Sequence, residues 1–361
     1  MKLIAQVKLQ PSPEQYRALL DTLGAVNDAA GYISNKAWET KTFRQYDLHH
    51  LLYYDLRQRF KLSAQIVVRV LAKVADAYKL DGETKRLFSR HGSIAYDKRI
   101  LSWKPDAVSI WTTGGRLKIP FVAGHRQKEI LQYRSGEADL ILRNGEFYLH
   151  QVCEVEEPPP DNATDFLGID LGIVNIAADS DGNIYSGGQV NGLRKRHTKL
   201  RSKLQSKRTK ASKRLLKKRS KKEKRFATHV NHCISKSVVA RAKDSGRGIA
   251  LEDLTHIRDR ISVRKCQRRQ QHSWAFNQLR QFIQYKARLA GVLVALVDPR
   301  NTSRTCPRCG CIDKRNRPSQ SLFSCTSCGF SANADVVAAG IIAGRGLVND
   351  PHFSPAPNGA G

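Results

Sequence analysis

The sequence predicts an α+β protein of more than one domain, and three observations lead to this fold class. Helical spacing of apolar residues in the first quarter of the chain gives way near residue 93 to short β-rich runs. An acidic, proline-rich stretch without periodicity, EEPPPDNAT at 156–164, reads as a linker between domains. Strands then alternate with helices, and two Cys-x-x-Cys pairs interrupt that pattern. With 361 residues, 40% of them hydrophobic, the chain can bury a core in each domain.

The first domain is expected over residues 1–155. Residues 2–10 alternate weakly as a strand does, and Pro11 and Pro13 end that strand before a helical stretch at about 14–90. From 93 to 155 the runs SIAYD, AVSIW, LKIPF, DLILR and EFYLHQVCEV are separated by Thr-Gly-Gly and Asn-Gly turns. We therefore expect a small β-barrel or sheet with a helical insertion.

The second domain is expected to begin after the linker and to run over 165–300. It opens with three strands, FLGIDLG, IVNIAADSDG and NIYSGG, and continues with a strand GRGIALED, a helix at 272–290 and a strand VLVALVD. A cysteine-rich insertion at 301–331 separates this part from a last segment, 332–346. Residues 347–361, which contain three prolines and two glycines, are expected to form a disordered tail.

The charge of the chain points to a polyanionic partner. The 62 Lys and Arg exceed the 32 Asp and Glu by 30, and the isoelectric point is near 10.1. No run reaches the roughly 18 apolar residues that a spanning helix needs. The start MKLIAQVKLQ lacks the apolar core of a signal peptide. We expect a cytoplasmic protein that binds nucleic acid and no membrane.

More than half of the excess charge lies in one run. Residues 194–225 contain 18 Lys or Arg and one acid, Glu223. Leu193, Leu200, Leu204, Ala211 and Leu215 recur at steps of 7, 4, 7 and 4, which predicts a basic helical region at 193–226 with a thin apolar stripe. A solvated helix is the alternative, but charges of one sign repel one another, which favours contact with a nucleic-acid backbone. The candidate contacts are Lys207, Arg208, Lys210, Lys213, Arg214, Lys217, Lys218 and Arg219.

Four of the eight cysteines have the spacing of a structural zinc site. Cys306 and Cys309 form one C-x2-C pair, and Cys325 and Cys328 form a second pair after fifteen intervening residues. Two such knuckles present four thiolates tetrahedrally to Zn²⁺ and leave no open position for water. Cys311 could compete as a ligand, but C-x-C is the less usual knuckle. The cysteines outside these pairs have no partner pattern and are expected to be buried thiols: Cys153, Cys233, Cys266 and Cys311.

Three acids are candidates for a second metal site. Asp170 ends the apolar run 166–169, and Glu252 ends the run 249–251. The carboxyl ends of strands in an open sheet are where sites gather, so adjacent strands would bring these two carboxylates together. Asp335 begins an Ala-rich helical stretch whose small side chains permit close packing on the sheet. Three clustered carboxylates require cations, and hard oxygen ligands favour Mg²⁺ or Mn²⁺. Two metals about 4 Å apart would support phosphodiester hydrolysis.

These motifs together resemble the TnpB proteins encoded by bacterial insertion sequences, which are relatives of the type V CRISPR effectors. The resemblance is carried by GIDLG with Asp170, the basic run, ALEDL with Glu252, HSWAFNQLRQFIQYKA leading into DPRNTSRTCPRCG, FSCTSCGF, and ADVVAA with Asp335. It covers most of the chain.

The resemblance implies an RNA-guided DNA endonuclease encoded by a transposon. It implies that Asp170, Glu252 and Asp335 are the acids of a RuvC-like nuclease with an RNase H-type fold, and that the four paired cysteines form a zinc ribbon inserted before the last acid. The N-terminal half would be a wedge barrel with a helical recognition insertion. The implied partners are a guide RNA from the transposon end and double-stranded target DNA. An RNA-guided DNA-binding regulator without cleavage and a strand-transfer transposase remain as alternatives.

Overall fold

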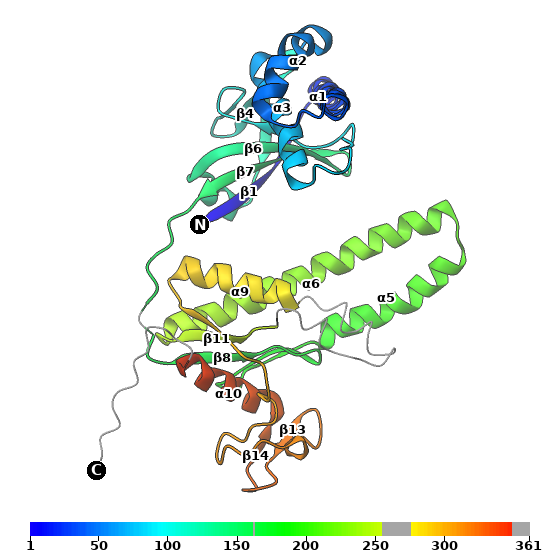
Figure 1. The fold of residues 1–361 in the computed structure, drawn as a ribbon. Coiled ribbons are helices and arrows are strands. Elements are labelled where there is room, and N and C mark those ends of the chain that lie inside the picture. The colour runs from blue at the N-terminus through cyan, green and yellow to red at the C-terminus, as the bar shows by residue number, and fades with distance from the viewer. Residues whose placement is uncertain (162, 255–275, 349–361) are drawn as a thin grey trace. The chain divides into compact units, whose positions relative to one another are not determined.

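The structure, a computed structural model, describes residues 1–161, 163–254 and 276–348. The chain forms two compact units, Met1–Glu156 and Glu157–Gly361, which we call the N-terminal and C-terminal units. Each unit combines a β-sheet with helices, so the predicted α+β, multidomain fold class is confirmed (Figure 1).

The N-terminal unit contains a seven-stranded sheet in the order β2-β6-β7-β1-β5-β4-β3, and every neighbouring pair is antiparallel. Tyr96 on β2 donates its hydroxyl to the carbonyl of Trp111 on β4. β2, at one end of the order, therefore approaches β4, the last strand but one at the other end, and the sheet is a nearly closed barrel. The strands are β1 (Lys2–Leu9), β2 (Ile94–Tyr96), β3 (Leu101–Trp103), β4 (Ala107–Thr112), β5 (Gly115–Val122), β6 (Arg134–Arg143) and β7 (Glu146–Glu154).

Three helices lie between β1 and β2 in the chain: α1 (Pro13–Thr40), α2 (Gln45–Phe60) and α3 (Ala64–Leu80). Ser12 begins α1 with a capping box to Gln15, and Pro13 occupies the first turn, where a missing N–H costs nothing. The helical stretch ends at Leu80 and not near residue 90. Asp81 is extended there, and its carboxylate accepts the backbone N–H groups of Glu83 and Thr84, which holds a turn instead.

The C-terminal unit has a five-stranded sheet in the order β10-β9-β8-β11-β12. The pairs β10–β9 and β9–β8 are antiparallel, whereas the pairs β8–β11 and β11–β12 are parallel. The strands are β8 (Phe166–Asp170), β9 (Asn175–Asp179), β10 (Ile184–Ser186), β11 (Gly248–Glu252) and β12 (Val294–Val297). All five predicted strands are present.

Helices cover both faces of this sheet, α6 (Lys210–Asp244) and α9 (Phe276–Ala290) on one face and α10 (Ala334–Val348) on the other (Figure 1). Alternate side chains of each strand face opposite sides. Leu167 and Leu251 accordingly pack in the core with α6 and α9, while Phe166 and Ala250 pack with α10. Residues 272–275 of the predicted helix lie outside the described residues.

The basic run is helical but is not one helix. It divides between α5 (Gly188–Ser206) and α6, with a turn at 207–209 in which Arg208 has a left-handed φ of 50°. Thr209 caps α6 by accepting the backbone N–H of Ser212. The predicted apolar stripe is therefore only partly correct: Leu204 is buried, whereas Ala211 and Leu215 are exposed.

The cysteine-rich insertion contains a short helix, η1 (Lys314–Asn316), and a hairpin of β13 (Leu322–Ser324) and β14 (Ser331–Asn333).

Residues 347 and 348, expected in the tail, belong to α10, and the rest of that tail, 349–361, lies outside the described residues. Of the four cysteines expected to be buried thiols, Cys153 is buried, Cys311 is partly buried and Cys233 is exposed, contrary to expectation. Cys266 lies outside the described residues. In the described part of the chain, no helix combines the length and apolar character needed to cross a bilayer.

Candidate active site and cysteine cluster

Asp170 and Glu252 end two neighbouring parallel strands, β8 and β11. Ile169 is the register partner of Leu251, so the two acids that follow lie side by side at the carboxyl edge of the sheet. The buried apolar residues before each acid fix the strands, and the acids take the first positions where the sheet opens.

Asp335 reaches the same edge from α10, and the packing of α10 on the sheet depends on glycine residues. A Cβ atom built on Gly168 would lie 2.0 Å from the carbonyl oxygen of Ala339, and one on Gly346 would lie 2.8 Å from the Cβ of Ala250. Only glycine permits this approach of helix to sheet. Asn333 accepts the backbone N–H of Asp335, which fixes the first turn of α10.

The three carboxylates line one pocket of about 280 Å³. Arg317 donates to Asp335 Oδ1 at 2.9 Å, and Asn175 donates its amide N–H to Asp335 Oδ2 at 2.8 Å. Thr302 donates its hydroxyl to Glu252 Oε1 at 2.6 Å. No sequence pattern predicted these three donors, and each of them orients an acid of the pocket.

The pocket disfavours negative charge. Burial, and then the nearby carboxylates of Glu252 and Asp335, raise the pKa of Asp170 to about 7, although Arg317 opposes the change. Burial also raises the pKa of Glu252, against the hydrogen bond from Thr302. Burial and the neighbouring carboxylates thus disfavour the charged forms of these acids, and bound cations would offset both effects.

The four paired cysteines converge on one point. Their sulfur atoms all lie within 4.8 Å of one another, and no other set of three or more His, Cys, Asp or Glu residues in the described ranges does so. The three acids thus share a pocket without converging this closely. Cys306 Sγ lies 3.6 Å from Cys328 Sγ, and Cys309 Sγ lies 3.5 Å from Cys325 Sγ. Zn–S bonds of about 2.3 Å in a tetrahedron place sulfurs about 3.8 Å apart, so the cluster fits Zn²⁺.

Further contacts support this cluster. The backbone N–H groups of Cys328 and Ser327 point at Cys325 Sγ and lower the pKa of that thiol. Asn316 is fully buried and joins the two knuckles, because its amide donates to the carbonyl of Cys311 and its oxygen accepts the N–H of Thr326. Cys311 is not one of the four converging cysteines.

The eight candidate phosphate contacts all have exposed side chains on the turn at 207–209 and the first part of α6. Within the described residues, none of them forms an ion pair with a carboxylate. Glu223 joins the two basic helices: its carboxylate accepts from Arg201 at 3.3 Å, lies 3.3 Å from His197 Nδ1, and lies 3.8 Å from Arg194 Nε. Figure 1 shows α5 and α6 side by side as a hairpin that extends beyond the sheet. The cations of 207–219 therefore form one exposed surface at the end of that hairpin.

The fold and these sites define a multidomain α+β protein with a carboxylate pocket and a zinc-ribbon-like cysteine cluster. Residues 150–255 match the family model described as a probable transposase of the IS605 OrfB type, and residues 276–342 match the Cas12f1-like TNB domain. The TnpB-like protein of Methanocaldococcus jannaschii is 34% identical over 232 residues, which cover 60% of this chain and 82% of that protein. The chain belongs to the TnpB family.

Other relatives are similar over shorter segments. The CRISPR-associated endodeoxyribonuclease Cas12f1 of Sulfoacidibacillus thermotolerans is 44% identical over 119 residues, 33% of this chain and 27% of that protein. InsQ of Escherichia coli K12, a candidate RNA-guided DNA endonuclease by its name, is 25% identical over 65% of this chain and 63% of its own length. The solved structure of the mini-RNA-guided endonuclease CRISPR-Cas_phi3 is similar in fold, with a TM-score of 0.58 at 9% identity, over 99% of this chain and 94% of that chain.

Proposed function

We propose that this protein is an RNA-guided DNA endonuclease that hydrolyses phosphodiester bonds at a RuvC-like site formed by Asp170, Glu252 and Asp335. The observation that carries the proposal is the pocket itself: residues from β8, β11 and α10, far apart in sequence, bring three acids to one cavity. The names of the relatives, a CRISPR-associated endodeoxyribonuclease and a candidate RNA-guided endonuclease, support the same activity. The sheet order, three antiparallel strands and then two parallel ones, supports an RNase H-like fold.

The donor set of the pocket fits divalent cations. Carboxylate oxygens are the hard ligands that Mg²⁺ and Mn²⁺ prefer, and burial together with the carboxylates of Glu252 and Asp335 raises the pKa of Asp170, a cost that bound cations would offset. When bound, two such ions activate water and stabilise the leaving oxygen of the scissile phosphodiester. Asp170, Glu252 and Asp335 would hold them.

The surrounding residues position these acids. Asn175 and Arg317 fix the two oxygens of Asp335, and Thr302 fixes one oxygen of Glu252. The cavity of about 280 Å³ admits a phosphate group and water. Because Arg317 is a cation at the wall of this cavity, it also attracts the phosphate of the substrate strand.

The remaining features supply binding and stability. We assign structural Zn²⁺ to Cys306, Cys309, Cys325 and Cys328 in a ribbon at about 301–331. We assign the exposed cations of residues 207–219 to the phosphates of guide RNA or of the RNA–DNA heteroduplex. The guide would come from the transposon end, and the target would be double-stranded DNA. The N-terminal unit would serve as a wedge barrel with α1, α2 and α3 as a recognition insertion.

One other function has a specific observation in its favour. Arg317 and Asn175 occupy both oxygens of Asp335, an arrangement that would also suit an RNA-guided DNA-binding regulator without cleavage. The complete set of acids favours the nuclease.

A plasmid assay tests the proposal. The full chain, co-expressed with RNA from the transposon end, is incubated with supercoiled plasmids that carry matched or mismatched targets. We expect Mg²⁺-dependent linearisation or nicking of the matched plasmid only. Guide-dependent binding without strand breaks in Mg²⁺ or Mn²⁺ would instead support the regulator, and cutting without RNA would contradict RNA guidance.

A further inference from the structure

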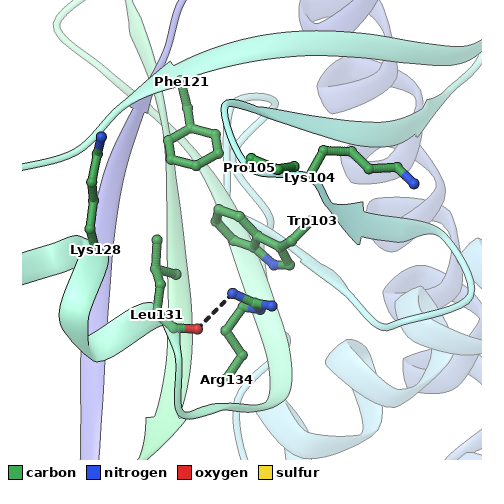
Figure 2. Close-up of a pocket in the computed structure, with 7 residues that line it drawn as sticks. All are labelled: Trp103, Lys104, Pro105, Phe121, Lys128, Leu131 and Arg134. Atoms are coloured by element: carbon green, nitrogen blue, oxygen red, sulfur yellow. Dashed lines mark hydrogen bonds between the residues drawn. The ribbon is translucent and has the colours of Figure 1, made fainter.

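A second pocket, in the N-terminal unit, combines aromatic and cationic side chains. Its volume is about 340 Å³, within the range of small-ligand sites. The lining residues include three cations and no acid, and they are Trp103, Lys104, Pro105, Phe121, Lys128, Leu131 and Arg134 (Figure 2). Trp103 lies on β3, Phe121 on β5 and Lys128 on α4 (His125–Leu131).

The two aromatic rings form a preset surface. The indole of Trp103 and the ring of Phe121 meet edge to face, with centroids 5.4 Å apart and an interplanar angle of 80°. Both side chains are only partly buried. In Figure 2 the indole lies between Phe121 and the guanidinium of Arg134. Partly exposed aromatic rings of this kind bind flat, polarisable groups by stacking.

A buried glutamine holds the indole in place. Trp103 Nε1 donates to Gln151 Oε1 at 2.9 Å. The amide nitrogen of Gln151 donates to the backbone carbonyls of Val152 at 2.8 Å and Ser135 at 3.0 Å, so its oxygen must face the indole. Gln151 is only 4% exposed. The ring orientation is therefore fixed before any ligand arrives, which lowers the entropy cost of binding.

The cations stand around these rings. Arg134 donates one N–H to the carbonyl of Leu131 at 2.7 Å, which fixes its side chain and leaves further guanidinium donors for a ligand. Lys128 is exposed on α4 at the other side of the opening (Figure 2). The side chain of Lys104 extends away from the rings in that view. Arg134 and Lys128 are thus the groups placed to meet an anion beside a stacked ring.

We infer that this pocket binds one unpaired nucleotide of a nucleic-acid strand, with the base against Trp103 and its phosphate between Arg134 and Lys128. A flat aromatic base attached to a phosphate is the ligand that has both required parts, a π face and a negative charge. An acidic peptide would use the cations without the rings, and an apolar ligand would use the rings without the cations. The inference rests on the proposed function, which supplies the strand.

Cross-linking identifies the strand. The full chain with its co-expressed RNA is irradiated with ultraviolet light, alone or after addition of target DNA, and nucleotide adducts are mapped by mass spectrometry. We expect an adduct on Trp103 or Phe121, carrying a ribonucleotide if the guide occupies the pocket and a deoxyribonucleotide if the target does. Adducts found only elsewhere in both arms would contradict the inference.

Binding measurements test the roles of the residues. The probes are a fluorescein-labelled single-stranded RNA and a DNA of the same sequence, added to nuclease-treated full chain. Trp103→Leu keeps apolar bulk but removes the stacking face, so affinity for the source strand should fall about 5- to 150-fold. Trp111→Leu, at a partly buried tryptophan on β4 outside the pocket, is the matched control and should bind like the wild type.

Lys128→Gln provides a test that does not depend on the fold of the core. It should lower the slope of log affinity against log salt by about 0.7 for a single strand, while Lys118→Gln, at an exposed lysine on β5, should not. Wild-type affinity in Trp103→Leu together with a wild-type slope in Lys128→Gln would overturn the inference. Neither variant alters the carboxylate pocket, so this failure is distinct from a failure of the proposed nuclease.

Discussion

The replacement Asp170→Asn should stabilise the C-terminal unit at neutral and alkaline pH when Mg²⁺ is absent. The folded state raises the pKa of Asp170 from 3.8 to about 7. Between these two values the folded protein holds a proton that the unfolded chain has lost, so the free energy of unfolding falls as pH rises through this window and stays low above it. The change of about 3 units corresponds to at most about 4 kcal/mol, which an uncharged amide would recover.

The assay is thermal unfolding of zinc-loaded protein, free of Mg²⁺, at about pH 5 and about pH 8. The gain in Tm for Asp170→Asn should be larger at the higher pH. Added Mg²⁺ should then stabilise the wild type and not the variant, so the difference in Tm between the two proteins should become smaller. Asp181→Asn is the control, and its effect on Tm should have the opposite sign. The hydrogen bond that Asp181 accepts from Arg247 lowers the pKa of Asp181 and favours its charged form, which the amide lacks. A variant Asp170→Asn no more stable than the wild type at about pH 8 would refute the electrostatic reasoning.

Two further predictions concern zinc and the basic helices. Replacing both Cys325 and Cys328 with Ser should release zinc and lower the Tm, because structural zinc contributes folding free energy; unchanged zinc content in the purified variant would contradict this. Changing the exposed residues Lys213, Arg214, Lys217 and Lys218 to Gln should weaken binding to matched and mismatched targets alike and flatten the salt slope by up to about 4 units for duplex. Glutamine is a good helix former, so α6 should persist. A wild-type salt slope would indicate that these residues lie on an ordinary solvated helix and do not contact phosphates.

The parts of the fold that the sequence predicted are those controlled by local pattern. The apolar runs before Asp170 and Glu252 identified two strands and placed both acids at strand ends, because strand period and burial are local properties. The break between α5 and α6 was missed, since the basic residues on either side are all good helix formers. Thr209, followed by Lys210 and the rest of α6, was the capping signal that could have indicated it.

The contacts that complete the pocket were not predictable from local pattern. Arg317 follows η1, and Asn175 begins β9, 160 residues before the Asp335 whose carboxylate it contacts. Neither position has a spacing or neighbour that marks it. Their roles arise only when α10 packs through Gly168 onto β8 and the cysteine-rich insertion folds beside the sheet edge. The three acids, by contrast, could be proposed from the sequence because each follows or begins a recognisable element.

The proposed function requires Asp170, Glu252 and Asp335 for DNA cleavage and not for DNA binding. The most direct measurement compares strand cleavage and RNA-dependent target binding for Asp170→Ala, Glu252→Ala and Asp335→Ala against the wild-type complex in Mg²⁺. We predict that each variant loses cleavage while its affinity for the matched target stays close to wild type, because each change would remove a proposed metal ligand from a site that is not proposed to hold the duplex. Substantial cleavage by any one of the three variants would contradict the account.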